Sequence, residues 1–358
     1  MDYLGRQRRL AEALERLKLD ALLVTHTVNV RYLCGFTGSN AALIATHRRL
    51  VLFTDGRYTE QANAEAQHAK VMIARGPLLP EAAKVVHRLR IKSLGIEAEH
   101  MSAATKAELK RLVSKAVRLR DTSLVVEQLR QIKELAEINS IRESVIAGAR
   151  LFDTALEAIR PGVRETGVAA EMEYAARRLG AEGMSFDTIV AAGRRSALPH
   201  GRASASPIPA RGFVVLDWGV KLSGYCSDQT RTVHVGTPDA DTRSQYTAVR
   251  EAQQAAIEAV RPGVLVGDVD RAARQLLLAA GLARYFTHST GHGVGLEIHE
   301  RPRIAQGQQE PLRAGMVITI EPGVYITGRG GVRIEDMVCV TPTGYEVLTP
   351  THKELISL

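Results

Sequence analysis

Long apolar runs are absent from this 358-residue sequence: no stretch comes near the roughly 18 consecutive apolar residues of a membrane-spanning helix. The first residues, MDYLGRQRRLAEALERL, form a charged amphipathic pattern and lack the apolar stretch of a signal peptide. Cysteine is scarce as well. Cys34, Cys226 and Cys339 are scattered, odd in number and form no C-x-x-C pair, which favours a reduced, cytoplasmic setting.

Aromatic residues are also few, and this bears on the net charge of +8. The densest basic stretch, KAELKRLVSKAVRLR at residues 106–120, contains no aromatic side chain on which a base could stack. Its Leu109, Leu112 and Val117 recur at helical spacing, so we expect the lysines to form the solvated face of a helix. The pattern therefore argues against a nucleic-acid-binding module.

The length and the 45% apolar content suit two domains, with a boundary expected between residues 123 and 124. The first of them alternates short apolar runs with helical patterns, which predicts a small layered α/β domain. Asp55 and Arg57 lie in a predicted turn and are expected to form a local salt bridge, and nothing else there indicates catalysis. The expected strands are 20–25, 41–47, 48–56, 70–75 and 93–98, and the expected helices are Arg6–Leu17, Tyr58–Ala66, Glu81–Arg88 and Thr105–Val113.

The second domain opens with a helical stretch at about 126–159 and contains an internal repeat. Residues 155–180, ALEAIRPGVRETGVAAEMEYAARRLG, are echoed by residues 256–281, AIEAVRPGVLVGDVDRAARQLLLAAG. Each copy predicts a helix, a break at R-P-G-V and a second helix, because proline lacks the N–H that continues a helix. A functional site is expected in the crevice between such duplicated halves.

Carboxylates interrupt several strand-like segments that follow the two repeats. Asp217 follows Val-Val-Leu, and Glu321 follows Val-Ile-Thr-Ile. Desolvating an ionised carboxylate costs several kcal/mol unless a positive charge compensates it. One such residue could pair with an arginine, but a set of four, completed by Asp228 and Glu335 and joined by a histidine, indicates a site that surrounds cations.

Four carboxylates and one imidazole suit Mn²⁺, Co²⁺, Fe²⁺ or Zn²⁺, and their charge balances two divalent ions better than one. Two metals about 3.5–4 Å apart can activate a shared water at neutral pH. The strand period of two places Thr319 beside Glu321 and Arg333 beside Glu335, as supporting side chains. Asp336 then points to the other face and is expected to form a structural ion pair.

Two histidines, His292 and His299, lie in GHGVGLEIHE at residues 291–300. The zinc signature H-E-x-x-H fails here, because Arg-Pro-Arg follows His299 and Glu300 where a helix would have to continue. From these residues alone the two histidines could be metal ligands, a catalytic pair or structural loop histidines.

The segments DWG, SDQTRT, GHGVGLEIHE, TIEPG and GVRIED closely resemble the pita-bread metallopeptidases, a family that includes methionine aminopeptidase, aminopeptidase P, prolidase and creatinase. The resemblance implies an α+β pita-bread catalytic domain at residues 124–358, with the internal repeat as its pseudo-twofold halves. It implies two divalent metal ions, Mn²⁺ before Co²⁺ or Zn²⁺, with Asp228 and Glu335 bridging them. The implied ligands are Asp217, Asp228, His292, Glu321 and Glu335.

The resemblance also implies roles around the substrate, a proline-containing peptide. His200, in ALPHG, and His299 would donate hydrogen bonds to the scissile carbonyl or pass a proton to the leaving amine. Glu321 would take a proton from the attacking water. Tyr325 and Arg333 would line the substrate site.

The first domain, residues 1–123, resembles the creatinase/prolidase amino-terminal domain through NVRYLCGFTGSNAAL and LFTDGRYTEQA. The short methionine aminopeptidases lack this extension, and creatinase works without the metal set that is intact here. An intact set also argues against a non-catalytic scaffold. The resemblance further implies a homodimer in which the first domain of one subunit borders the active site of the other.

Two enzymes that cleave Xaa-Pro bonds remain. GFTGSN and FTDGRYTEQA favour aminopeptidase P, which releases the first residue of an Xaa-Pro peptide. Arg301 and Arg303, in HERPRI, favour prolidase, because an arginine can clamp the free proline carboxylate of a dipeptide. We take aminopeptidase P as the first expectation and prolidase as the alternative.

Overall fold

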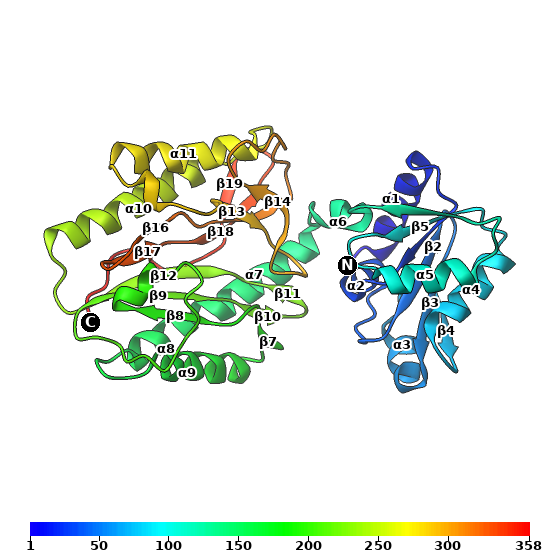
Figure 1. The fold of residues 1–358 in the computed structure, drawn as a ribbon, viewed down its shortest axis with the longest axis horizontal. Helices are drawn as coiled ribbons and strands as arrows, with labels where there is room; N and C mark the ends of the chain where they lie inside the picture. Colours follow the sequence, from blue (N-terminus) through cyan, green and yellow to red (C-terminus); the bar gives the residue numbers. More distant parts are fainter. The chain divides into compact units, whose positions relative to one another are not determined.

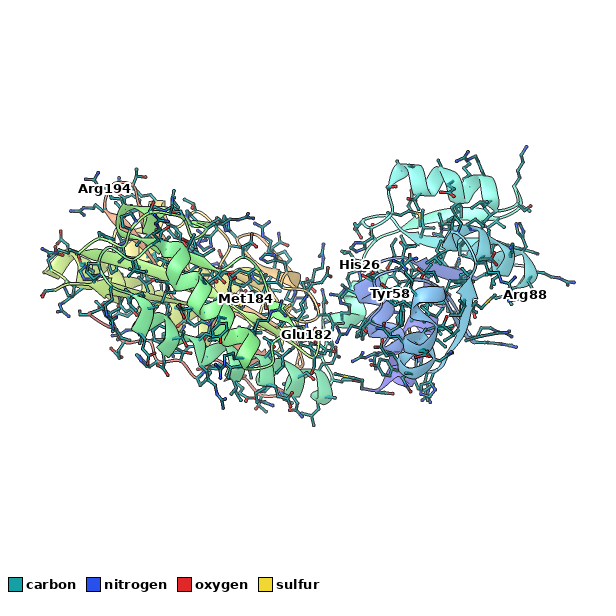
Figure 2. The ribbon with its side chains drawn as sticks, turned by 90° about the horizontal axis from the view of Figure 1, so that it is seen from below. His26, Tyr58, Arg88, Glu182, Met184 and Arg194 are labelled. Atoms are coloured by element: carbon teal, nitrogen blue, oxygen red, sulfur yellow. The ribbon has the colours of Figure 1, made fainter.

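The computed structural model describes residues 1–358, and the chain divides into two compact units, Met1–Arg130 and Gln131–Leu358 (Figure 1). Figure 2 shows the same units with their side chains. The first unit extends past the boundary expected at residues 123 and 124 and includes helix α6, Val125–Arg130. No helix in the chain combines the length and the apolar character needed to cross a membrane.

The first unit is an α/β layer structure, as the alternating sequence pattern predicts. Its strands are β1 Ala21–Val24, β2 Ala42–Thr46, β3 Leu50–Asp55, β4 Ala69–Ala74, β5 Ser93–Glu97 and β6 Arg118–Thr122. Its other helices are α1 Tyr3–Arg16, α2 Thr27–Cys34, α3 Thr59–Glu65, α4 Leu78–Arg88 and α5 Ala103–Leu112. The sheet order is β4-β3-β2-β1-β5-β6. Strands β1, β5 and β6 are parallel neighbours, and β2 runs antiparallel to both β1 and β3.

Two elements of the first unit differ from the sequence expectations. The basic stretch at 106–120 is not one helix, because α5 ends at Leu112 and the backbone of Val113 is extended. Residues 118–122 instead form β6, an edge strand whose charged side chains face solvent, a common protection of a sheet edge. Helix α2 was not expected. The expected salt bridge in the turn after β3 is present, at 2.9 Å between Arg57 Nη2 and Asp55 Oδ2.

The second unit begins with α7, Leu135–Ala149, and contains two helix pairs that match the internal repeat. The pairs are α8 Leu151–Ala158 with α9 Glu165–Arg178, and α10 Ala240–Glu258 with α11 Val266–Ala279. Gly162 and Gly263, in the two R-P-G-V breaks, both adopt positive φ, at 88° and 87°. The helical stretch expected at about 126–159 is divided among three helices, α6, α7 and α8. Between α6 and α7 the backbone N–H of Lys133 donates to the Gly315 oxygen instead of continuing a helix.

The strands of the second unit are β7 Gly183–Met184, β8 Ile189–Ala192, β9 Gly212–Trp218, β10 Val220–Leu222, β11 Tyr225–Cys226, β12 Gln229–Val235, β13 Gly291–Gly293, β14 Glu300–Ile304, β15 Val317–Ile320, β16 Gly323–Ile326, β17 Gly330–Arg333, β18 Asp336–Val340 and β19 Tyr345–Val347. Helices α8 and α9 share an apolar core with β8, β9 and β12. Helices α10 and α11 share a second core with β15 to β18. Each repeat therefore covers its own strands, and Figure 1 shows one helix pair on each side of the strand layer.

The two halves meet where Thr230, in β12, forms a β-bridge with Glu335. Thr230 also stands opposite Asp217 in the antiparallel pair of β9 and β12. A row of neighbouring backbone positions thus runs from Asp217 through Thr230 to Glu335, and it carries two carboxylates from different halves. This is the α+β pita-bread architecture with an internal repeat that the sequence predicts.

Candidate metal centre

The carboxylates and the histidine singled out in the second unit come from strands or strand ends of both halves. The side chain of His292 is central: its Nε2 lies 3.5 Å from Asp228 Oδ2 and 3.4 Å from Glu321 Oε1. One potential ligand atom each from Asp228, His292 and Glu335 lies within 4.8 Å of the others. The residues that sequence analysis placed in one site are therefore neighbours in space.

The cluster places several carboxyl groups together away from solvent. Asp228 and Glu335 are only 5% and 1% exposed. Burial, reinforced by repulsion from neighbouring carboxylates that include Asp217 and Glu321, raises the pKa of both well above the ordinary range. Burial likewise raises the pKa of Glu321 to about 8, against the pull of the Arg333 charge. Carboxylates in this condition are stabilised either by protons or by cations.

Asp217 provides a second, independent indication. Its Oδ2 accepts a hydrogen bond of 2.5 Å from Arg333 Nη2, whereas its Oδ1 is buried with no hydrogen-bond partner. An orphaned buried carboxylate oxygen is costly, and a cation in the cluster would supply its partner. Burial, followed by the proximity of His299, lowers the pKa of His292 to about 4, which keeps its imidazole in the neutral form that binds metals. The residues therefore fit a divalent metal centre.

Several polar side chains orient the members of the cluster. Thr230 Oγ1 donates to Glu335 Oε2 at 2.7 Å. The hydroxyl of Thr319 accepts from the His292 backbone N–H at 3.1 Å and donates to Glu321 at 3.3 Å, as the strand period predicts. His292 Nδ1 lies 3.0 Å from the backbone oxygen of Gly293, which leaves Nε2 directed at the carboxylates. Such hydrogen bonds fix the geometry of metal-binding side chains.

Arg333 connects this cluster to the expected substrate side. Its Nη1 donates to the hydroxyl of Tyr325 at 2.7 Å and to the carbonyl oxygen of Pro199 at 2.9 Å. The second contact attaches the ALPHG loop, which carries the exposed His200, to the cluster. The ring of His299 lies edge-on to the ring of His292, with centroids 4.3 Å apart. Burial lowers the pKa of His299, and the nearby His200 lowers it further.

Arg303 stands directly opposite His292 in the antiparallel pair of β13 and β14. Directly opposed residues project from the same face of a sheet, so the guanidinium and the imidazole share a face. Arg303 and Arg301 are both exposed. A charged group on the same face as a potential metal ligand is well placed to meet the far end of a short substrate.

Two members of this region are not apparent from the sequence. His288 is half-buried, and its Nε2 lies 2.9 Å from the Tyr325 hydroxyl, so it belongs to the same network as Arg333. Thr230 was quoted within SDQTRT, but its bond to Glu335 depends on a bridge between segments far apart in the sequence. The structural ion pair expected for Asp336 is present: Arg231 and Lys353 bind its carboxylate at 2.7 and 2.9 Å.

Two family models cover most of the chain. Metallopeptidase family M24 matches residues 139–342, and the creatinase/prolidase N-terminal domain matches residues 6–132. An Xaa-Pro dipeptidase of Pyrococcus horikoshii is 37% identical over 360 residues, which cover 99% of this chain and all of that protein.

Solved structures are also similar to this chain over nearly its whole length. An Xaa-Pro dipeptidase from Bacillus anthracis superposes with a TM-score of 0.97 at 40% identity, covering 99% of this chain and 100% of the other. An X-Pro aminopeptidase from Thermotoga maritima has a TM-score of 0.90 at 35% identity, covering 96% of this chain and 99% of the other.

Proposed function

The chain belongs to metallopeptidase family M24, and on that premise we propose that it is an Xaa-Pro dipeptidase, which hydrolyses the bond between an amino acid and a carboxy-terminal proline. It is an enzyme of the Xaa-Pro peptidase branch, and the relatives named Xaa-Pro dipeptidases support prolidase activity better than the aminopeptidase P activity first expected from the sequence. The structural observation that carries the proposal is the position of Arg303 opposite His292.

Dipeptide specificity requires a group that recognises the free proline carboxylate. Arg303 is exposed and shares the sheet face of His292, so a dipeptide whose scissile carbonyl lies at the metal cluster would extend its carboxylate towards a guanidinium. Arginine suits this purpose, because its planar donors match the two carboxylate oxygens. A longer peptide has no charge at that point and would gain nothing from the arginine.

The proposed metal ligands are Asp217, Asp228, His292, Glu321 and Glu335, holding two divalent ions, with Mn²⁺ as the first candidate and Co²⁺ or Zn²⁺ as alternatives. The orphaned Asp217 oxygen and the raised pKa values of the buried carboxylates support this set. When bound, the two ions would polarise the scissile carbonyl and make water nucleophilic at neutral pH.

The remaining steps fall to the protein side chains. Glu321 would accept the proton that the attacking water loses, and the proline nitrogen must receive a proton as it leaves. His299, next to His292, is placed to donate a hydrogen bond to the developing oxyanion, and His200 on the ALPHG loop to deliver the proton. Tyr325, held by Arg333 and His288, would present its hydroxyl to the substrate.

Proline explains why such a site is needed. A peptide bond to proline has no N–H, and the ring fixes φ, so a peptidase that aligns substrate by strand pairing loses a hydrogen bond and meets the ring. A cluster that acts on the carbonyl from one side does not depend on that N–H. The homodimer and the cytoplasmic location expected from the sequence stay predictions.

A second candidate is an Xaa-Pro aminopeptidase, favoured by the likeness to the Thermotoga maritima structure. A peptide panel separates the two: Xaa-Pro, Xaa-Pro-Yaa and longer peptides, each with Mn²⁺, Co²⁺ and Zn²⁺ in turn. We expect dipeptides to be cleaved and longer peptides to be poor substrates. Equal or faster cleavage of tripeptides would establish the aminopeptidase instead, and no cleavage of any Xaa-Pro bond under all three metals would reject both.

A further inference from the structure

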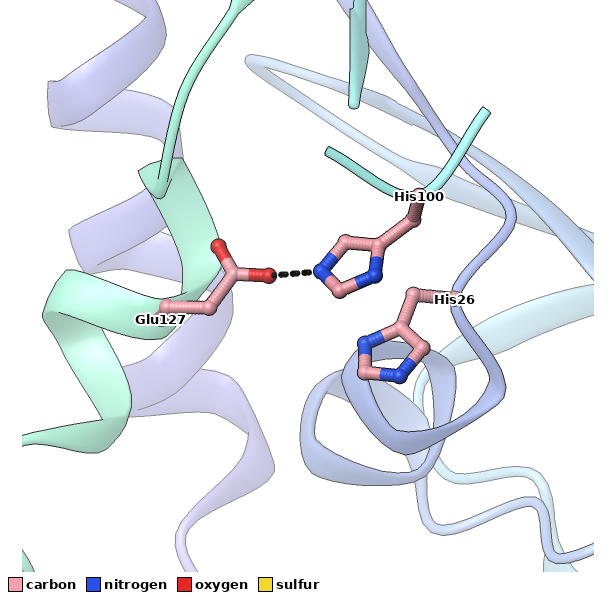
Figure 3. A group of neighbouring side chains, drawn as sticks. All are labelled: His26, His100 and Glu127. Carbon is pink, nitrogen blue, oxygen red and sulfur yellow. Dashed lines mark hydrogen bonds and ion pairs between the residues drawn. The ribbon is translucent and has the colours of Figure 1, made fainter. Parts of the chain in front are cut away.

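A second group of potential metal ligands lies in the first unit, where sequence analysis expected no chemistry. It consists of His26, His100 and Glu127 (Figure 3). One ligand atom from each lies within 4.8 Å of the other two. The two imidazole rings are stacked, with centroids 3.8 Å apart and planes within 7°, and His100 Nε2 lies 2.9 Å from Glu127 Oε1.

The sheet topology explains why residues so far apart in the sequence converge. Strands β1, β5 and β6 are parallel neighbours, so their carboxyl ends lie at one edge of the sheet. His26 follows β1, His100 lies in the turn after β5, and Glu127 lies in α6, which follows β6. Ligand sites in open α/β sheets form at the carboxyl ends of the strands. Each of the three strands therefore delivers one donor to that edge.

A buried polar network holds two of the three donors in place. Glu97, the last residue of β5, accepts the backbone N–H groups of Thr25 and His26 at 2.6 and 2.9 Å. Asn29 Nδ2 donates to Glu97 Oε1 at 2.7 Å and to Glu127 Oε1 at 2.6 Å. Arg130 in turn donates to the Asn29 side-chain oxygen at 2.7 Å. Glu97 thus fixes the backbone at His26, while Asn29 fixes the carboxylate of Glu127.

The network also leaves negative charge close to the histidines. Burial raises the pKa of Glu97, and its hydrogen bonds to Asn29 and the backbone counteract that rise. Glu97 and Glu127 both accept from the Asn29 amide, so two carboxylates lie close together beside the histidines. A cation between the imidazoles and Glu127 would offset this charge.

We propose that His26, His100 and Glu127 form a binding site for one transition-metal ion of the Zn²⁺ type, separate from the peptidase centre. Two imidazoles and one carboxylate are a donor set that binds zinc with a fourth position open to water. Ligand atoms of a tetrahedral zinc site lie roughly 3.4 Å apart, so rotation of the side chains must close the group by about an ångström. The ion would tie α6 to the turns that follow β1 and β5.

The exposure of the site matches a reversible ion. The side chains of His100 and Glu127 are 26% and 16% exposed, so an ion can enter from solvent. Metal binds the unprotonated imidazole and carboxylate, so the ion would replace the hydrogen bond between His100 and Glu127. The proposal stands on residues outside the peptidase centre and is independent of the proposed dipeptidase activity.

The test is zinc stoichiometry of the full-length protein. Wild type, His26→Ala, His100→Ala and Glu127→Gln are dialysed against the same series of buffered free zinc concentrations, and bound zinc is measured at each by elemental analysis. We expect wild type to hold one equivalent more than His26→Ala and His100→Ala, and Glu127→Gln to bind that equivalent at least tenfold more weakly. Peptidase turnover and circular dichroism should be unchanged, which places the lost ion outside the catalytic centre.

His87→Ala is the matched control, because His87 is an exposed histidine of α4 in the same unit. Figure 2 shows His26 and Arg88, the neighbour of His87, at opposite sides of that unit. The control should keep the full wild-type zinc content. His100 lies in an exposed turn, so His100→Ala decides the matter even if His26→Ala does not fold. Equal zinc content in His100→Ala and wild type would overturn the proposal.

Discussion

Arg333 Nη2 and Asp217 Oδ2 are joined by a hydrogen bond of 2.5 Å, and both side chains are buried. The contact occupies one oxygen of Asp217 and leaves the other without a partner. Arg333 also reaches Thr230 at 3.1 Å and Tyr325 at 2.7 Å, so a single guanidinium orients a proposed metal ligand, its support and a substrate-side hydroxyl. A lysine carries the same charge, but its ammonium group cannot donate these hydrogen bonds in the fixed planar arrangement of a guanidinium.

Arg333→Lys should therefore lower peptidase turnover by roughly ten- to a hundredfold while the metal content changes little, since loss of an orienting partner typically has that size. Steady-state kinetics together with elemental analysis of the purified variant would measure both quantities. Arg329→Lys is the control, because the Arg329 side chain is exposed and pairs with the exposed Asp241 at 3.5 Å. Unchanged turnover in Arg333→Lys would show that the hydrogen bonds of the Arg333 guanidinium have no role in the reaction.

Glu335 and Asp336 are adjacent buried acids with different partners, which makes them a matched pair. Glu335 faces the metal cluster, whereas Asp336 is held by Arg231 and Lys353. Glu335→Gln, like Asp228→Asn, should lose bound metal and abolish turnover with little change in fold. Asp336→Asn should keep the metal but lose about 3–5 kcal/mol of stability, because it breaks a buried ion pair. Elemental analysis and urea unfolding would separate the two outcomes, and retained metal with normal turnover in Glu335→Gln would contradict the ligand assignment.

The rings of His292 and His299 are in edge-on contact, yet removing each of them should have a different effect on metal binding and turnover. His292→Ala should lose metal, because its Nε2 faces Asp228 and Glu321. His299→Ala should keep metal and lose turnover by on the order of 10²–10³, the usual effect of removing one transition-state hydrogen-bond donor. Metal content and turnover measured on both variants test this division, and identical metal loss in the two would refute it.

The metal-free protein should become less stable as pH rises. Burial raises the pKa of Glu321 from its ordinary 4.5 to about 8, so between these values the folded state binds more protons than the unfolded state. Stability then falls with pH across that window, and Asp228 and Glu335 act in the same direction. Urea unfolding in the presence of a chelator, followed by fluorescence of Trp218, would report this for the second unit alone, since Trp218 is the only tryptophan and is fully buried there.

Two comparisons complete the pH experiment. Glu321→Gln should flatten the slope, because it removes one of the titrating groups. Saturating Mn²⁺ should reverse it, since the ion binds the deprotonated carboxylates and gains affinity as pH rises. A metal-free protein whose stability increased from pH 4.5 to about 8 would show that these carboxylates are already ionised in the fold.

The grouping of these carboxylates was predictable because charges interrupt apolar strands, where a carboxylate at a position expected to be apolar stands out from the alternation of faces. Asp217 and Glu321 are such cases. The edge strand β6 was missed for the opposite reason: its charged side chains give no apolar alternation. The group of His26, His100 and Glu127 has no local signal at all, because each residue follows a different strand and only the parallel pairing of those strands brings them together.

On the proposed function Arg303 sets the substrate length, and the effect of removing it should be confined to dipeptides. A hydrogen bond between a charged pair in a partly dry site contributes about 1.5–3 kcal/mol, so Arg303→Ala should reduce dipeptide turnover by roughly one to two powers of ten. Tripeptide cleavage, which has no carboxylate at that position, should change less than about tenfold. Arg301→Ala is the comparison that tells the two candidate arginines apart: it removes another exposed arginine of the same strand, one that does not stand opposite His292. Turnover of Xaa-Pro and Xaa-Pro-Yaa substrates is measured for wild type, Arg303→Ala and Arg301→Ala. Equal losses of turnover on both substrates would mean that Arg303 supports the site without binding the proline carboxylate. Tripeptide turnover above dipeptide turnover in wild type would make the enzyme an aminopeptidase.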